Sequence, residues 1–389
     1  DAPGVWGGGC SGGWKKTSEP NGMKIGVTGT RGIPGIRGGV ETHCQQLYPR
    51  IAAMGHDVTV MRRSCYLAEA DDCGPDYRGV HLRDIFAPRF KSLEAVVHTF
   101  LAVIKAKSLH PDVLHIHAVG PSLLVPFAKM LGLKVVVTNH GPDYDRQKWG
   151  ALAKRVLRLG EKWGSRRADA VIVISQPIAD ALAANYGRRN TDLIYNGVET
   201  PAPCPGTDYL ESLGLTPGHY VIGLGRLVPE KRFDDLVKAF RKAAPDGYKL
   251  VIAGEADHPD EYSRSLHRLC DENGVVRTGF IKGERLRQVM SHAALFVLPS
   301  SHEGLPISLL EAMSYGLDVL TPDIPPNRIA QLEEDDFFTV GDTDTLARKI
   351  TERLSSATPR TPRAYDLSPY DWQTIAEKTL AVYRRVAAK

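Results

Sequence analysis

The chain has 389 residues, of which 42% are hydrophobic and 24% are charged, and its formal net charge is +4. This composition is typical of an ordinary globular protein, and no apolar run approaches the roughly 18 residues that a membrane-spanning helix needs. We expect no nucleic acid among the partners. A chain of this length exceeds one ordinary core, and we expect about two domains.

The first residues and the cysteines bear on the cellular compartment. Residues 1–22 are rich in Gly, Ser and Lys without hydrophobic periodicity, and we interpret them as a disordered lead or a remnant outside the folded protein. They contain no apolar core of a secretory signal. The six cysteines form no C-x-x-C pair, which is typical of a reducing compartment. We therefore expect a cytoplasmic protein.

Short apolar runs rich in β-branched residues alternate with helical patterns, which predicts parallel sheets with crossover helices. The strands predicted in the first half are residues 23–29, 56–63, 79–85, 112–119, 134–140 and 169–175. Helices are predicted over residues 38–54, 92–107 and 151–167. The proline-rich residues 198–218 lack a pattern and are typical of a linker. A second series of predicted strands covers residues 219–225, 248–254, 274–280, 294–300 and 317–323.

This order of elements predicts an α/β protein with two tandem Rossmann-like domains, each built on a parallel sheet. We place the N-terminal domain at residues 23–199 and the C-terminal domain at residues 200–368. Residues 369–389 form an amphipathic helix that can pack back on the N-terminal domain. Ligands in such sheets bind at the carboxyl ends of the strands, so the cleft between the domains is the predicted site.

A glycine-rich turn, GTRGIPGIRGGVET at residues 29–42, joins the first predicted strand to the first predicted helix. Such a turn usually receives a phosphate, because bare backbone N–H groups and the positive end of the helix can approach an anion closely. The dinucleotide fingerprint is G-x-G-x-x-G with an acidic residue about 20 positions on. Here the spacing is G-x-x-G-x-x-G-x-x-G-G, and the second strand ends in Arg62 and Arg63. Because these arginines suit a 2′-phosphate, an NADP-dependent oxidoreductase stays an alternative.

The predicted helix at residues 151–167 combines apolar and basic residues. Six basic residues surround four apolar residues at helical spacing, Leu152, Val156, Leu159 and Trp163. The helix also lies in the basic half, since residues 23–200 carry 24 Lys and Arg against 16 Asp and Glu, whereas residues 201–389 carry 23 against 27. The simpler interpretation is a packed helix with a basic outer face. The alternative is contact with anionic lipid headgroups or a lipid-linked acceptor, which would make the protein peripheral on the inner face of the membrane.

Two cations follow the first strand of the second half. Arg226 comes directly after that strand, and Lys231 lies five residues later, in the expected first turn of the next helix. Fixed cations at such a junction can neutralise a diphosphate and stabilise it as it departs. A surface cluster of charges is the alternative interpretation.

Two glutamates lie about 75 residues further along. Glu303 is in a loop before a predicted helix, and Glu311 is eight residues later within that helix. The backbone N–H groups that open the helix form a second anion-binding terminus, and they belong to Leu305, Ile307 and Ser308.

The segments GRLVPEKR, HEGLPISLLEAMSYG and GIRGGVET together resemble the family 4 retaining glycosyltransferases with the two-Rossmann-domain (GT-B) fold, of the bacterial surface-polysaccharide type. The resemblance covers nearly all of the chain from Met23 to the last residue. It implies a retaining, hexosyl-type transferase that moves a sugar from a nucleoside-diphosphate-sugar to an acceptor hydroxyl. It also implies polysaccharide or glycolipid biosynthesis, a carbohydrate or lipid-linked acceptor, and no requirement for a metal or another cofactor. A non-catalytic nucleotide-sugar-binding partner is the alternative from another class.

The resemblance assigns the donor to the second domain and the acceptor to the first. Arg226 and Lys231 are implied to bind the donor diphosphate, together with the N–H groups of the second-half helix. The backbone of Gly38 and Gly39 is implied to approach the same diphosphate from across the cleft.

Further roles follow from the same resemblance. Glu311 is implied to hydrogen-bond the ribose, Glu303 to contact the hydroxyls of the transferred sugar, and the Ile281 backbone to contact the base. His140 is implied to point at the donor sugar, and it joins Glu303 and the two cations as a catalytic residue. The candidate acceptor contacts are Arg31, Asp143, Asp145 and Arg146.

Smaller motifs have simpler interpretations. Residues 143–145 match the D-x-D of metal-dependent glycosyltransferases, but the two cations make a metal unnecessary. His115 and His117 lie on one face of a strand, as zinc ligands can, yet no third ligand has a suitable spacing, so we expect buried structural histidines. Residues 333–336, EEDD, are expected to form a solvated acidic turn. Asp318 stands where relatives commonly have proline.

Overall fold

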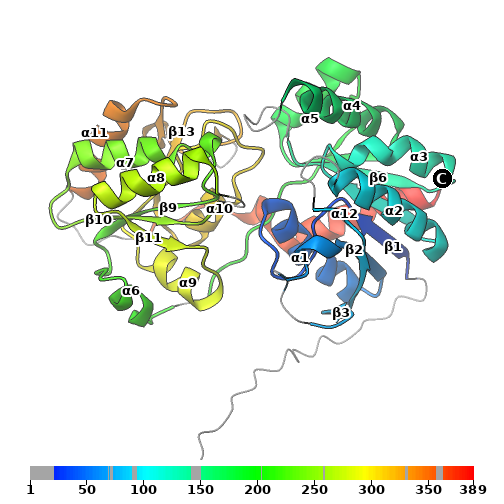
Figure 1. Ribbon diagram of the computed structural model, residues 1–389, viewed down its shortest axis with the longest axis horizontal. Helices are drawn as coiled ribbons and strands as arrows, with labels where there is room; N and C mark the ends of the chain where they lie inside the picture. The colour runs from blue at the N-terminus through cyan, green and yellow to red at the C-terminus, as the bar shows by residue number, and fades with distance from the viewer. Residues whose placement is uncertain are drawn as a thin grey trace, which may run out of the picture.

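The computed structural model describes residues 22–68, 70, 73–89, 94–141, 150–202, 204–256, 259–328, 332–355 and 362–389. These residues form two α/β domains that lie side by side in Figure 1. Apart from Gly22, the lead predicted at residues 1–22 lies outside the described residues.

The first domain is built on a sheet of eight strands in the order β3-β4-β2-β1-β5-β6-β7-β8. All neighbouring strands are parallel except β3 and β4. The central strands are buried along their whole length, because helices cover both faces of the sheet. The strands are β1 (Lys24–Thr28), β2 (Asp57–Arg63), β3 (Asp76–Tyr77), β4 (Val80–Ile85), β5 (Val113–His117), β6 (Val135–Asn139), β7 (Ala170–Val173) and β8 (Asp192–Leu193).

Helices connect these strands, and two of the predicted helices match the structure to within a residue. The helix predicted at residues 38–54 is α1, and the one at residues 151–167 is α4. The helical elements are α1 (Gly39–Ala53), η1 (Ser64–Tyr66), α2 (Glu94–Leu109), η2 (Pro121–Leu124), α3 (Val125–Met130), α4 (Ala151–Arg167) and α5 (Gln176–Tyr186).

The second domain has a six-stranded, parallel sheet in the order β11-β10-β9-β12-β13-β14. Its strands are β9 (Tyr220–Leu224), β10 (Lys249–Ala253), β11 (Val276–Gly279), β12 (Leu295–Val297), β13 (Asp318–Pro322) and β14 (Phe337–Phe338). Its helical elements are α6 (Asp208–Ser212), η4 (Pro229–Lys231), α7 (Phe233–Ala243), α8 (Glu261–Glu272), α9 (Gly283–Ser291), α10 (Ile307–Ser314), η6 (Glu334–Asp336), α11 (Thr343–Leu354) and η7 (Ser368–Tyr370).

The structure differs from two local predictions, the linker and the position of Lys231. The segment expected to be an unpatterned linker contains helix α6, because Leu210 is fully buried and anchors this short turn. Lys231 ends the 3-10 turn η4 and is not in the first turn of the next helix. The reason is Arg232, whose left-handed backbone (φ 50°) separates η4 from α7.

The last helix, α12 (Trp372–Ala387), returns to the first domain, where Figure 1 draws it in red beside α1. Its buried face includes Trp372 and Tyr383, which share one apolar cluster with Leu47 and Tyr48 of α1. Burying each large apolar side chain stabilises the packing by about 1.5–3 kcal/mol. The helix thus belongs structurally to the first domain although the second domain precedes it in the chain.

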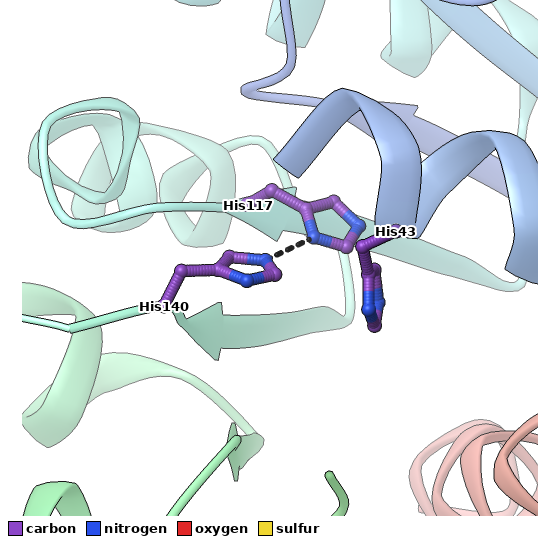
Figure 2. A group of neighbouring side chains, drawn as sticks. All are labelled: His43, His117 and His140. Atoms are coloured by element: carbon purple, nitrogen blue, oxygen red, sulfur yellow. Dashed lines mark hydrogen bonds between the residues drawn. The ribbon is translucent and has the colours of Figure 1, made fainter. Parts of the chain in front are cut away.

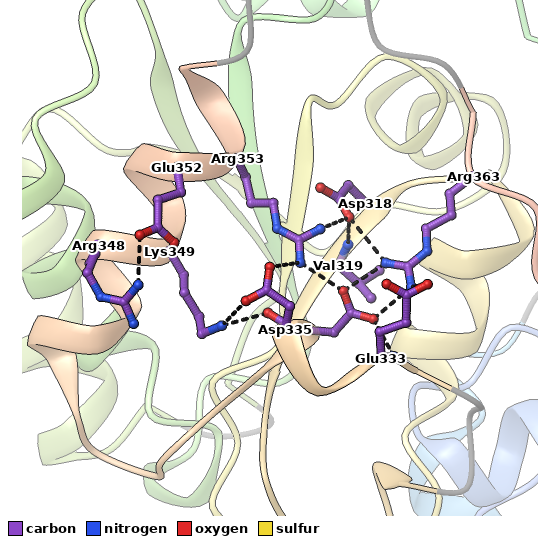
Figure 3. Close-up of polar contacts among 10 residues, drawn as sticks. Asp318, Val319, Glu333, Asp335, Arg348, Lys349, Glu352, Arg353 and Arg363 are labelled. Atoms are coloured by element: carbon purple, nitrogen blue, oxygen red, sulfur yellow. Dashed lines mark hydrogen bonds and ion pairs between the residues drawn. The ribbon is translucent and has the colours of Figure 1, made fainter.

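The acidic segment at residues 333–336 is the expected solvated turn only in part, since residues 333–335 are exposed and Asp336 is not. Asp336 is fully buried, and its carboxylate accepts hydrogen bonds from Arg353 at 3.0 Å and from Arg363 at 2.7 and 2.9 Å. Figure 3 shows both arginines also reaching Asp318, whose carboxylate lies 2.7 Å from Arg353. The prediction is wrong for Asp336 because two guanidinium groups from distant segments neutralise its carboxylate. The same pairing explains an acidic residue at position 318.

The order of the strands determines which loops lie at the ligand-binding edge of each sheet. In each sheet the chain reverses its direction of winding next to the first strand, between β1 and β5 and between β9 and β12. Ligands of open α/β sheets bind at such switch points, beyond the carboxyl ends of the strands. The glycine-rich turn follows β1, and the segments that contain Arg226 and Glu303 follow β9 and β12. Within the described part of the chain, no helix combines the length and the apolar character needed to cross a membrane.

Candidate active site

The loops after β9 and β12 are tied to each other. The backbone N–H and the hydroxyl of Ser301 both donate to the carbonyl of Glu230, at 2.9 and 3.2 Å. Beside this contact, Lys231 Nζ lies 2.5 Å from Glu303 Oε1, and the two side chains are only 15% and 10% exposed. Arg226 is in the same loop, two residues after β9, and is partly buried. The structure therefore brings three of the predicted catalytic residues to one edge of the second sheet.

Glu311 lies on the face of α10 that is turned toward the first domain. It is one helical turn beyond Ile307, whose Cδ1 lies 3.8 Å from the position of a Cβ built on Gly39. Burial raises the pKa of Glu311 to about 7. Among the described residues none donates a hydrogen bond to this carboxylate or forms an ion pair with it. It is thus an acceptor ready for a ligand's hydroxyl groups.

Two helix N-termini meet at the same place. Helix α1 begins at Gly39 after Gly38, and α10 begins at Ile307 after Pro306, and neither first turn is capped by a side chain. The orphan N–H groups of such turns need hydrogen-bond acceptors, and anions are favoured there. Ile307 and Ser308 lie in this first turn as predicted, whereas Leu305 precedes the helix by two residues.

The glycine-rich turn is held in shape by side chains of α1. Glu41 accepts hydrogen bonds from the hydroxyl of Thr30 at 3.2 Å and from the backbone of Arg31 at 2.8 Å. Gly38 has a φ of 142°, and a Cβ there would lie 2.0 Å from a Glu41 oxygen. Glycine is therefore required at position 38, and the turn is shaped before any ligand arrives.

The two domains also touch through the loops that carry His140 and Glu303. A Cβ at Gly304 would lie 2.5 Å from the carbonyl oxygen of His140. A second contact crosses the domains where the Arg37 guanidinium lies 4.4 Å from the centroid of the Phe280 ring. Phe280 precedes Ile281, the residue predicted to contact the base, and Ile281 is buried.

His140 belongs to a cluster with His43 and His117, which Figure 2 draws together. His117 Nδ1 lies 3.0 Å from His140 Nε2, and His43 Nδ1 lies 2.9 Å from the Asn196 amide oxygen. One nitrogen from each ring lies within 4.8 Å of the others, so the group could hold a metal ion. His115 and His117 are both fully buried, as expected. The group that could hold a metal ion does not contain His115: it combines His117 with His43 of α1 and His140 after β6, which no short spacing reveals.

The histidines of this region are neutral. Burial lowers the pKa of His43 to about 4 and that of His115 to about 3. It also lowers the pKa of His117 and His140 well below the usual value, with a smaller contribution from the neighbouring histidines. Each ring therefore has one N–H donor and one lone pair at neutral pH.

Both halves of the chain match known families of glycosyltransferases. Residues 37–201 match the model described as Glycosyltransferase Family 4, and residues 211–365 match the one described as Glycosyl transferases group 1. The chain belongs to the family 4 and group 1 glycosyltransferases. It is 26% identical over 408 residues to the alpha-maltose-1-phosphate synthase of Mycolicibacterium smegmatis, covering 94% of this chain and 100% of that protein.

Solved structures confirm the predicted GT-B fold. Sucrose-phosphate synthase from Thermosynechococcus elongatus matches with a TM-score of 0.73 at 21% identity, covering 94% of this chain and 99% of that one. HepE of Anabaena, solved with UDP-glucose, matches with a TM-score of 0.70 at 19% identity, covering 94% and 98%.

Arg62 and Arg63, which left an NADP-dependent oxidoreductase as an alternative, form ion pairs within this glycosyltransferase. Arg62 pairs with Asp84 at 2.7 Å, and Arg63 pairs with Glu94 at 2.5 Å. All four side chains lie within the first domain, where these pairs join β2 to β4 and α2. The pairs give the arginines a structural role, which removes the argument for a 2′-phosphate.

Only one of the four predicted acceptor contacts lies among the described residues. Asp143, Asp145 and Arg146, and with them the D-x-D match, lie outside the described residues. Arg31 lies in the glycine-rich turn, and its guanidinium donates to the Arg37 carbonyl at 3.3 Å. The structure thus places Arg31 in the first domain, in the turn between β1 and α1.

A hollow of about 270 Å³ opens at the carboxyl ends of β9, β10 and β11. Its lining includes Leu227, Gly254, Glu255, Thr278 and Gly279. It adjoins Arg226 and the segment before Ile281 but contains none of the predicted cation or glutamate positions. It therefore lies beside the predicted base contact.

Proposed function

We propose that this glycosyltransferase moves a hexosyl group from a nucleoside-diphosphate-sugar to an acceptor hydroxyl, with retention of the anomeric configuration and without a metal ion. The observation that carries the proposal is the Lys231–Glu303 pair, which lies beside two uncapped helix N-termini from opposite domains. Cations and helix N-termini around one cleft suit a diphosphate.

The donor diphosphate is the anion in this proposal. Arg226 and Lys231 neutralise it from the second domain, and the backbone of Gly38 and Gly39 approaches it from the first. As the bond to the sugar breaks, negative charge grows on the departing diphosphate, and donors already in place stabilise that charge. This provides the electrostatic assistance that a bound metal supplies in other enzymes.

The glutamates hold the sugar and ribose hydroxyl groups. Glu311 accepts hydrogen bonds from the ribose, because its carboxylate has no donor among the described residues. Glu303 accepts from the transferred sugar while Lys231 keeps its charge balanced. The Ile281 backbone contacts the base. HepE was solved with UDP-glucose and Arabidopsis starch synthase IV with ADP, which supports a nucleoside diphosphate but leaves the base open.

The chemical step is a front-face displacement. The bond from the anomeric carbon to the diphosphate oxygen breaks, the bond to the acceptor oxygen forms on the same face, and the acceptor proton moves to the departing phosphate. Glu303 has one oxygen paired with Lys231, so it suits hydrogen bonding better than nucleophilic attack. His140, from the first domain, donates or accepts a hydrogen bond at a hydroxyl of the donor sugar.

We also propose that the protein works in polysaccharide or glycolipid assembly, peripherally on the inner face of the membrane. On α4, Leu152 is 76% exposed, and Val156 and Leu159 are each 37% exposed. They form one stripe, with exposed arginines and lysines beside it. The opposite face of α4 packs on the first domain at Glu161, which is buried and accepts a hydrogen bond from the Asn139 side chain at 3.0 Å. An apolar stripe with basic neighbours suits an anionic bilayer and a lipid-linked acceptor.

Thermal unfolding in EDTA with UDP, GDP, ADP, dTDP, CMP or NADP(H) tests the donor site. A ligand at about 100 times its dissociation constant adds about 2.7 kcal/mol of stability. We expect one nucleoside diphosphate to stabilise the protein and Arg226→Ala to abolish the effect. Stabilisation by NADP(H) alone would contradict the proposal.

The matching nucleotide-sugars, offered in EDTA with glycan and lipid-linked acceptors, then test transfer, and NMR of the product gives its anomeric configuration. Nucleotide binding without transfer to any acceptor would favour a non-catalytic binding partner.

A further inference from the structure

A chain of polar side chains leads from His140 into the core of the first domain. His140 Nε2 lies 3.0 Å from His117 Nδ1, and the other ring nitrogen of His117 is hydrogen-bonded to the Tyr48 hydroxyl. The same hydroxyl lies 3.0 Å from His115 Nδ1. Tyr48, His115 and His117 are all fully buried. Four side chains from α1, β5 and the end of β6 are therefore hydrogen-bonded in series.

The chain ends at two further hydroxyl groups. His115 Nε2 lies 2.7 Å from the Thr138 hydroxyl, and His115 Nδ1 lies 2.5 Å from the hydroxyl of Tyr383 on α12. The Tyr48 and Tyr383 hydroxyls also interact with each other. Both tyrosines thus touch His115 Nδ1, but only Tyr48 connects His115 to His117.

Because these side chains are buried, the donor and acceptor roles in one hydrogen bond of the chain depend on those in the next. A neutral imidazole has one N–H and one lone pair, so if His117 donates through one nitrogen it must accept through the other. The same condition holds for His115. Because buried polar groups are costly when unpaired, a reversed bond at one nitrogen of a ring forces reversal at its other nitrogen. The Tyr48 hydroxyl couples the two rings because it has a single hydrogen, which it can donate to only one of the two histidines.

The shared direction fixes the ring tautomer of His140. When His117 Nδ1 carries the hydrogen, His140 Nε2 accepts and His140 Nδ1 must be the donor. When His140 Nε2 carries the hydrogen, its Nδ1 is an acceptor instead. One tautomer donates to a sugar hydroxyl and the other accepts from it.

We infer that Tyr48, His117 and His115 are positioning residues that act as a unit to hold His140 in a single ring tautomer. The inference rests on the proposed function for its catalytic meaning, since His140 is the member that faces the donor. The coupling itself exists in the protein without any ligand.

Two conservative variants separate this role from a merely structural one. Tyr48→Phe and Tyr383→Phe each remove one fully buried hydroxyl that touches His115, but only Tyr48→Phe cuts the connection to His117. Tyr220→Phe is the distant control, because that buried hydroxyl donates to the Val289 carbonyl in the second domain, at 2.8 Å.

The measurement is ¹⁵N NMR of the histidine rings in the ligand-free protein, with EDTA present so that no metal ion competes for the nitrogens. We expect His140 to show one tautomer in the unmodified protein, in Tyr383→Phe and in Tyr220→Phe, and a mixture in Tyr48→Phe. An unchanged single tautomer in Tyr48→Phe would overturn the inference, and so would equal changes in the two tyrosine variants of the chain.

If Tyr48→Phe does not fold, 3-fluorotyrosine at position 48 keeps the shape and alters the acidity of the hydroxyl. The ¹⁵N shifts of His117 and His140 should then move together, and independent shifts would contradict the coupling. Transfer assays complete the test: Tyr48→Phe should lower kcat with little change in donor KM. Because the NMR experiment contains no donor, failure to find a transferase activity would overturn the proposed function and leave the coupling intact.

Discussion

The carbonyl oxygen of His140 occupies the space where a side chain at position 304 would begin, 2.5 Å from the position of a Cβ on Gly304. His140 belongs to the first domain, and Gly304 follows Glu303 in the second. The glycine therefore sets how closely the two halves of the candidate site approach each other.

Replacing Gly304 with alanine should separate the two loops. The obstructing atom is a backbone oxygen, which cannot yield as the end of a flexible side chain can. We expect kcat/KM to fall by about 100-fold, since misplacement of catalytic groups by about 1 Å has that effect. Gly150→Ala is the control, because a Cβ there meets no described atom within 4 Å. Equal activity in both variants would show that the contact is irrelevant to turnover.

The sequence predicts the architecture well because the signals are local. Strands β5, β6 and β7 are buried on both faces, so their composition alone marks them. The cations and glutamates are predicted because each lies in a short motif. His43 and Tyr48 escape prediction since both look like ordinary residues of an amphipathic helix. Their role depends on side-chain contacts with His115 and His117 of β5 and with His140 after β6, which no local pattern indicates. Asp336 was misjudged for the same reason, because its arginine partners are 17 and 27 residues away.

Loss of Lys231 should reduce turnover more than it reduces stability. Lys231→Ala removes the cation that we propose stabilises the departing diphosphate, and we expect kcat to fall by about 100-fold or more. Steady-state release of nucleoside diphosphate measures it. Lys238→Ala is a matched control, since it breaks an exposed lysine–carboxylate pair of 2.7 Å with Asp234 on α7. Unchanged kcat in Lys231→Ala would remove this residue from the mechanism.

The raised pKa of Glu311 predicts a pH dependence of stability. The pKa of a Glu side chain in the unfolded chain is about 4.3, whereas burial raises the pKa of Glu311 in the folded protein to about 7. Between these values the folded protein binds more protons than the unfolded chain, so its free energy of unfolding falls as pH rises through this window. Above about pH 7 this loss is complete. Glu311→Gln should flatten that part of the profile in urea titrations at several pH values.

The same carboxyl group should control nucleotide affinity. When Glu311 is protonated, it offers fewer acceptors to the ribose, so nucleoside diphosphate binding should weaken as pH falls below about 7. Calorimetric titration across this range measures the dissociation constant. In Glu311→Gln the affinity should be weaker and its dependence on pH smaller. A profile with the same slope in both proteins would place the responsible group elsewhere.

The exposed stripe on α4 should bind anionic membranes. Leu152→Gln combined with Leu159→Gln should reduce co-sedimentation with vesicles that contain phosphatidylglycerol, because it removes apolar surface from the stripe. Raising the salt concentration should weaken the binding of the unmodified protein through screening of the basic residues. Met130→Gln is the control, since Met130 is 83% exposed on α3, outside the stripe. Absence of binding at low salt would contradict a peripheral membrane location.

Asp336 should matter for stability and not for chemistry. Asp336→Asn keeps the shape of the side chain but leaves Arg353 and Arg363 facing a neutral group in a buried position. Removing one partner of a buried pair costs about 3–5 kcal/mol, and the arginines are 20% and 23% exposed, so we expect about 3 kcal/mol in urea unfolding of the second domain. Asp323→Asn is the matched control: its carboxylate is 46% exposed and pairs with the exposed Arg328, so its loss should cost much less. Equal losses in the two variants would mean that burial of Asp336 adds nothing to the arginine network. A fall in kcat of Asp336→Asn under conditions where it is folded would instead connect the network to the loops of the site.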